Sequence, residues 1–154
     1  MQQKEQEQIW GEYTKFKKDY ELSLKNNKPF PEIVKDIMRE KGLTIENLQD
    51  KSKIDRRTIV RLRTGLIKTK TLEMEYLPTK KTIVAFCVAC DLDMLNAITL
   101  LESLGLSFKK TSLIDYAYCY IITNCRGKEI HERNTVLKSF GIDAADLLRD
   151  DTLK

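Results

Sequence analysis

The sequence predicts an all-α protein, and two observations support this prediction. Only three prolines and six glycines interrupt the 154 residues. Val, Ile and Thr nowhere alternate with polar residues over a long run, as they would along a half-buried strand. Apolar residues make up 42% of the chain, which is enough for a packed core. The length suits one ordinary domain or two very small ones.

The N-terminal segment, residues 1–29, is predicted to form an amphipathic helix. Its apolar residues recur at steps of four, three, four and four, which is the spacing of one helix face. They are Ile9, Tyr13, Phe16, Tyr20 and Leu24, with Trp10 beside them. A single helix cannot bury such a stripe, so we expect it to dock on the following domain or on a partner chain.

Five helices are predicted within residues 30–106. Residues that favour a helix start, such as Pro31, Thr44 and Asp55, stand before or in the first turn of these helices, and a glycine follows several of them. The predicted helices cover residues 31–41, 45–51, 56–64, 80–89 and 94–104. Residues 66–77 lack a regular pattern and are predicted to form a long loop.

Residues 107–154 are predicted to form a short helical extension. Ser112 suits the N-cap of a helix over 113–124, which ends before Gly127. A further helix is expected over 130–140, and Asp143 suits the cap of a last short turn through Leu148.

A basic block lies in the middle of the chain. Residues 51–81 hold ten Lys or Arg and three acidic residues, a local charge of +7, so the rest of the chain sums to −3 against a total of +4. Such a block in a near-neutral protein is typical of a surface that binds a polyanion, although a merely solvated surface is the alternative.

Residues 43–65 carry the functional prediction. Four apolar residues stand where two short crossed helices must share a core: Leu48, Ile54, Ile59 and Leu62. The link over 52–55 leaves no room for a long loop. In such a helix-turn-helix the second helix, here 56–64, places its first turn in the major groove of DNA.

The side chains that would reach DNA lie on the face of helix 56–64 that is opposite its buried residues. Arginine pairs with guanine through two parallel hydrogen bonds, and a threonine can reach a phosphate or a thymine methyl group. Basic residues at the helix exit are expected to touch phosphates, which adds affinity without sequence information. The predicted DNA-binding set is Thr44, Arg56, Arg57, Thr58, Val60, Arg61, Arg63, Lys68 and Lys70.

Residues 31–104 resemble the XRE family, the lambda-repressor-like helix-turn-helix proteins. The resemblance rests on Gly42-Leu43-Thr44, a Ser-x-Ile-Asp turn at 52–55, an Ile-x-x-Leu step at 59–62 before Gly65, a Thr-Ile-x-x-Phe-Cys helix at 82–87, and Asp93. It implies a lambda-repressor-like domain of five helices around one core. By position, it implies base contacts at residues 56, 57, 60 and 61. Residues 105–142 resemble a helical tail found in some bacterial XRE regulators, in which Asn134 is expected to bond a backbone group.

No metal site, cofactor or catalytic centre is predicted, and the protein is not expected to be an enzyme. Cys87 and Cys90 form a Cys-x-x-Cys pair, but a structural metal site needs four ligands at suitable spacing, and this pair stands in an apolar helix. Cys125, beside a basic neighbour and a helix end, is the expected exposed thiol. His131 has no second histidine four residues later, so the metalloprotease pattern is absent.

The aromatic residues near the start of the extension are predicted to belong to the core. Tyr116, Tyr118, Tyr120 and Phe108 follow helical spacing, whereas base-stacking platforms are typical of strands.

We expect a cytoplasmic transcriptional regulator that binds double-stranded DNA as a homodimer. We expect it to act as a repressor. The chain start has no apolar run like a signal peptide, and no window reaches the roughly 18 apolar residues of a membrane span. The N-terminal helix and the C-terminal helices are the two candidates for the dimer contact or for a protein partner. The alternative is a protein-interaction module, such as an antitoxin or adaptor, that keeps the helix-turn-helix for its shape.

Overall fold

The computed structural model describes residues 3–24, 28–65 and 77–148, and every regular element in these ranges is helical. The all-α prediction is therefore confirmed for the described residues. The elements are α1 (Gln3–Leu24), α2 (Phe30–Glu40), α3 (Ile45–Ser52), α4 (Arg56–Thr64), α5 (Lys80–Ala89), α6 (Met94–Ser103), α7 (Leu113–Asn124), α8 (Ile130–Ser139) and the short 3₁₀ turn η1 (Ala144–Asp146).

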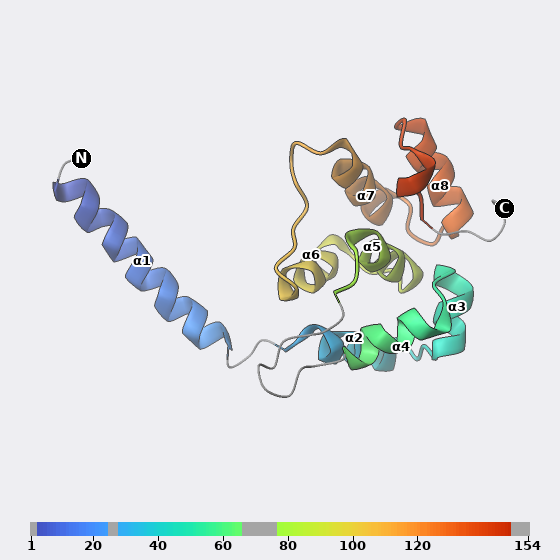
Figure 1. Ribbon diagram of the computed structural model, residues 1–154, viewed down its shortest axis with the longest axis horizontal. Helices are drawn as coiled ribbons and strands as arrows, with labels where there is room; N and C mark the ends of the chain where they lie inside the picture. The colour runs from blue at the N-terminus through green and yellow to red at the C-terminus, as the bar shows by residue number, and fades with distance from the viewer. Residues whose placement is uncertain (1–2, 25–27, 66–76, 149–154) are drawn as a thin grey trace.

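Helix α5 is the centre of the body. It packs against α3, α6, α7 and α8. Figure 1 shows α5 and α6 between α2, α3 and α4 on one side and α7 and α8 on the other. The sequence explains this place, because every residue from Ile83 to Val88 is buried and α5 is apolar on all sides rather than on one stripe.

Side-chain caps confirm several of the predicted helix starts, whereas α2 and α8 begin without one and Asp143 precedes η1 without a side-chain cap bond. Thr44 accepts from the backbone N–H of Asn47, Asp55 from Thr58, Asp93 from Asn96 and Ser112 from Asp115. Each cap satisfies a backbone donor that the first turn of a helix leaves without a partner. The predicted ranges of α4, α5 and α7 coincide with the observed helices, and those of α2, α3, α6 and α8 differ by one residue at one or both ends.

Buried polar side chains tie α7, α8 and the C-terminal turn to the body. Lys80 on α5 pairs with the carboxylate of Asp115, which is 5% exposed, at 2.8 Å. Asn134 donates to the Leu148 carbonyl and accepts from the Leu148 N–H, both at 2.8 Å. The prediction that Asn134 bonds a backbone group is confirmed.

Two predictions about the C-terminal helices are wrong. Tyr118 is buried, but Tyr116 and Tyr120 are 59% and 38% exposed, because residues 116 and 120 share the face of α7 that faces away from the body. Cys125 is not the exposed thiol: it is 7% exposed, and Cys119 is the cysteine with partial exposure. Cys87 and Cys90 are buried as expected.

Helix α1 stands apart from the body. Among the described residues it makes no extensive contact with another helix, and Figure 1 shows it projecting away from α2. Ile9, Trp10 and Tyr13 of its apolar stripe are exposed, so these three described side chains do not show the expected docking on the following helices. No helix in the described part of the chain combines the length and the apolar character that crossing a membrane requires.

Candidate nucleic-acid interface

A short turn of three residues, 53–55, joins α3 to α4. Ser52 is fully buried there. Its hydroxyl donates to the Leu48 carbonyl at 2.5 Å and accepts from the Ile54 N–H at 3.1 Å. Lys53 takes a left-handed conformation with φ 57°, which reverses the chain direction. These contacts fix the angle at which α4 leaves the turn, so its outward face has a defined position.

Helix α4 has two distinct faces. Ile59 and Leu62 are 1% and 0% exposed and pack in the core, as the sequence predicts. The opposite face forms one shallow recess lined by Arg56, Arg57, Val60, Arg61 and Thr64. Four of these five residues belong to the predicted DNA-binding set, and the structure brings those four together. Thr64 is an addition that the sequence analysis missed, although its position one turn after Val60 places it on the same face.

The charges of this face are not all engaged within the chain. The Arg56 guanidinium donates from Nη1 to Glu46 Oε1 on α3 at 2.7 Å. That hydrogen bond, with a smaller contribution from a backbone hydrogen bond, lowers the pKa of the Glu46 carboxyl. Arg57 is exposed and makes no ion pair with any described residue. The recess therefore presents a cation that is available to an external anion.

The remaining predicted residues fall into other places. Thr44 and Arg63 line a second recess between α2, α3 and α4, together with Lys35 and Arg39, which the sequence analysis did not single out. The Thr44 hydroxyl already bonds Asn47, so its first role is structural. Thr58 is half-buried at the start of α4. Lys68 and Lys70 lie outside the described residues.

Glu46 is the residue of this surface that sequence reasoning missed most clearly. It stands ten positions before Arg56, on a different helix, and no local pattern connects the two. Only the crossing of α3 and α4 brings the carboxylate to the guanidinium.

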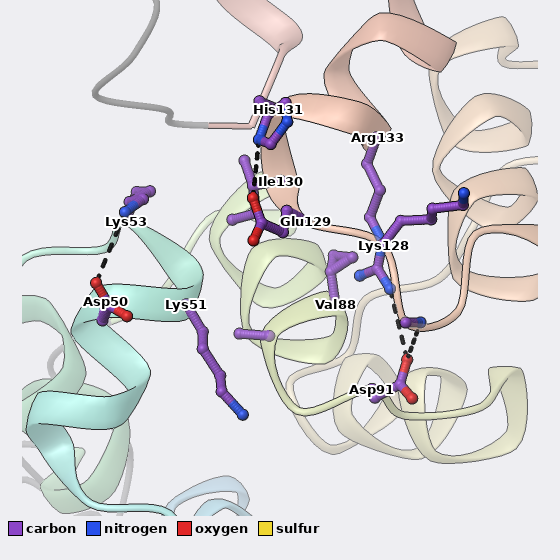
Figure 2. A pocket seen from close by; sticks show the side chains of 12 residues that line it. Asp50, Lys51, Lys53, Val88, Asp91, Lys128, Glu129, Ile130, His131 and Arg133 are labelled. Carbon is purple, nitrogen blue, oxygen red and sulfur yellow. Dashed lines mark hydrogen bonds and ion pairs between the residues drawn. The ribbon is translucent and has the colours of Figure 1, made fainter.

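A third cleft lies between α3, the end of α5 and the start of α8. Figure 2 shows Lys51 and Lys53 at the end of α3 on one side and Ile130 and His131 of α8 facing them, and Val88 of α5 also lines the cleft. The acidic groups of its wall already have partners within the chain. Asp50 lies 3.9 Å from Lys53, Asp91 3.5 Å from Arg133, and Glu129 3.2 Å from His131.

One group of possible metal ligands lies at the rim of this cleft. Ligand atoms of the exposed residues Glu129, His131 and Glu132 lie within 4.8 Å of one another. Glu129 pairs with His131, and Glu132 lies 3.6 Å from Lys128. These contacts account for the grouping without a metal, so it does not change the functional prediction.

No protein-family model, curated protein or solved structure matches the chain. The candidate interface therefore rests on the residues and geometry described above.

Proposed function

We propose that the protein is a sequence-specific DNA-binding regulator that inserts the start of α4 into the major groove. The observation that carries this proposal is the basic recess of α4, in which Arg56, Arg57, Val60 and Arg61 share one exposed face above a buried Ile59–Leu62 face. A helix with a fixed angle and a basic outer face matches the way in which a recognition helix enters DNA.

Each side chain of the recess has a defined chemical use in this proposal. Arg57, which has no ion partner among the described residues, suits two parallel hydrogen bonds to guanine O6 and N7. Val60 is 37% exposed and suits an apolar contact with a thymine methyl group. Lys35, Arg39 and Arg63, around the second recess, suit phosphates on the flanks. The family assignment to XRE and the action as a repressor belong to the same proposal.

A duplex-binding measurement tests the proposal. Sequences selected from random duplex DNA provide the ligand, and fluorescence anisotropy gives the dissociation constant at several salt concentrations. Replacing Arg56, Arg57 and Arg61 with Ala is expected to abolish specific binding, since each guanine contact discriminates by roughly 1–3 kcal/mol. The logarithm of affinity should fall linearly with the logarithm of salt concentration, with a slope near −0.9 for each phosphate neutralised.

The matched control removes the same charge from another surface. Lys109, Lys110 and Lys138 are exposed and lie outside both recesses. Replacing these three lysines with Ala should leave the selected sequence unchanged and reduce affinity only through the loss of net charge. Equal loss of binding in the two triple variants, or selection of no sequence, would refute sequence-specific reading by α4.

A second candidate function is protein binding, and exposed apolar residues on α7 favour it. Leu113 and Tyr116 are 56% and 59% exposed, and the rings of Tyr116 and Tyr120 meet Phe140 edge to face at centroid distances of 5.9 and 5.2 Å. Duplex binding that is weak, insensitive to salt and unaffected by the arginine substitutions would favour this second function.

A further inference from the structure

Helix α1 exposes apolar residues that no other described part of the chain covers. The side chains of Ile9, Trp10 and Tyr13 are 53%, 66% and 55% exposed, and Trp10 meets Tyr13 edge to face with centroids 5.8 Å apart. The helix has 22 residues and includes Gly11, which weakens a helix interior. A helix of this kind gains most of its stability in water from packing of its apolar face.

Four apolar residues of α1 follow the heptad spacing of a coiled coil. Ile9 and Phe16 stand seven residues apart, and so do Tyr13 and Tyr20. With Tyr13 and Tyr20 at positions a, Ile9 and Phe16 fall at positions d. Alternating steps of four and three between a and d residues form the narrow seam along which two helices interlock. Position f, on the outside of such a pair, is held by Lys4, Gly11 and Lys18, none of which needs burial.

The charges beside the seam identify both the partner and its direction. In this register the g positions hold Glu5, Glu12 and Asp19, all acidic. The e positions hold Gln3, Trp10, Lys17 and Leu24, of which Lys17 alone is charged. Two parallel copies place each g position opposite the e position five residues later on the other chain, so Glu12 faces Lys17 twice by symmetry. Two antiparallel copies would place g positions opposite g positions, and acids would face acids.

We propose that α1 pairs with α1 of a second copy of this chain as a parallel, in-register coiled coil. This arrangement goes beyond DNA binding by α4 and does not require it. A parallel pair places both bodies at the same end of the coiled coil, because α2 follows the C-terminal end of α1 in each chain (Figure 1). Two copies of α4 are then available at one end of the assembly, which suits a DNA site with two related halves.

Sedimentation equilibrium of the full chain without DNA tests the pairing. The unmodified protein is expected to show a concentration-dependent mass between that of a monomer and that of a dimer. Tyr13→Glu should raise the dissociation constant roughly tenfold or more, because an ionised side chain would be desolvated in the seam. Lys18→Glu, at an outer position on the same helix, is the matched control and should leave the dissociation constant unchanged.

A charge exchange distinguishes a loss of contacts between the two helices from a general loss of helical structure in α1. Glu12→Lys alone and Lys17→Glu alone place like charges across the seam and should each weaken the dimer roughly two- to fivefold. The double variant Glu12→Lys/Lys17→Glu restores opposite charges and should recover the dimer. Recovery requires that residues 12 and 17 of different chains face each other.

Disulfide trapping reports the direction of the two helices. Ile9→Cys should form an interchain disulfide under mild oxidation, because equivalent d positions face each other only in a parallel pair. Lys4→Cys, at an outer position, should not. A strictly monomeric protein, a dimer that Tyr13→Glu leaves intact, or single charge variants that dimerise as the double variant does would overturn the proposal. DNA binding is measured separately, so failure of the dimer and failure of DNA recognition give different results.

Discussion

Charged side chains are exposed on the outer face of α4, whereas they are buried and paired where the C-terminal helices meet the body. On α4, Arg57 is exposed without an ion partner in the described chain, and Arg56 reaches only an exposed carboxylate. Where α7 and α8 meet the body, Asp115, Arg133 and Asn134 are at least 95% buried, and each makes several polar contacts. Charges enclosed and paired stabilise the fold, whereas charges left open are available to a ligand.

Arg133 shows how completely the buried groups are satisfied. Its side chain is 2% exposed and donates twice to the Cys125 carbonyl, from Nε at 3.0 Å and from Nη2 at 2.8 Å. Nη2 also lies 3.5 Å from Asp91 Oδ1, and this carboxylate accepts from the Gly127 N–H at 3.1 Å. Burial lowers the pKa of the guanidinium, and Asp91 opposes that effect. One side chain therefore holds the end of α7 and the α7–α8 link against the end of α5.

Arg133→Ala is expected to have the largest effect on stability. The change removes both side-chain donors of the Cys125 carbonyl, which keeps only the Lys128 N–H at 3.1 Å, and it removes a partner of Asp91. The free energy of unfolding should therefore fall by about 3 kcal/mol. Urea denaturation followed by circular dichroism measures this loss. Arg126→Ala, which removes an exposed arginine bonded to the Asp91 carbonyl, should cost far less. Equal losses in the two variants would show that burial of Arg133 is not what makes it important.

Asn134→Ala is expected to rank second. It removes both hydrogen bonds to the Leu148 backbone and leaves a buried N–H and carbonyl unpaired, at a cost of about 2 kcal/mol. Thr135→Ala, at the exposed neighbouring position, is the control. If duplex binding at a temperature where both variants are folded is unchanged, the C-terminal extension supports the fold without contacting DNA. A selective loss of duplex binding in folded Asn134→Ala would show that the C-terminal helices, like the outer face of α4, contribute to DNA binding.

Tyr118→Phe should cost about 1 kcal/mol at neutral pH, because the buried hydroxyl donates to the Asp146 carbonyl at 2.6 Å. Burial, with nearby Asp146 and Asp115, raises the pKa of Tyr118 to about 12. In the unfolded chain tyrosine titrates near 10. The folded protein holds this proton more tightly, so its stability is full below about pH 10 and falls as the pH rises toward about 12.

Denaturation of both proteins at several pH values checks this sign. The stability difference between the unmodified protein and Tyr118→Phe should be constant up to about pH 9, and it should shrink above pH 10. A difference that grows with pH would contradict the raised pKa of the buried phenol.

Local signals were sufficient to predict most of the fold. Asp55 before α4 and Gly65 after it mark both ends of that helix, because a cap and a left-handed stop act within one turn of the chain. The inward positions of Ile59 and Leu62 follow from helical spacing, and the outward position of Arg57 follows from theirs.

The errors arose where a residue's surroundings come from distant parts of the chain. Spacing alone places Tyr116 and Tyr120 opposite Tyr118 on α7, but it does not say which face the body covers. Cys125 is 7% exposed at the link between α7 and α8, where Arg133, eight residues later, bonds its carbonyl. The contact between Glu46 and Arg56 depends on the crossing of two helices, so no sequence pattern predicts it.

Glu46→Gln is expected to have the smallest effect on stability and a clear effect on DNA binding. The Glu46–Arg56 pair is exposed on both sides, with side-chain exposures of 68% and 59%, so its loss should leave the unfolding midpoint almost unchanged. The amide removes a negative charge beside the proposed phosphate path and releases Arg56 from its strongest competitor. Duplex affinity should therefore rise several-fold. Glu102→Gln, which neutralises an exposed carboxylate on α6, should raise it only slightly.

If Glu46→Gln instead weakens binding or changes the selected sequence, the carboxylate orients Arg56 or contacts a base itself, such as cytosine through its N4 amino group. A rise in affinity without a change in stability would show that the charges on α4 act on DNA binding. Removal of Arg133 or Asn134, by contrast, is expected to lower the free energy of unfolding.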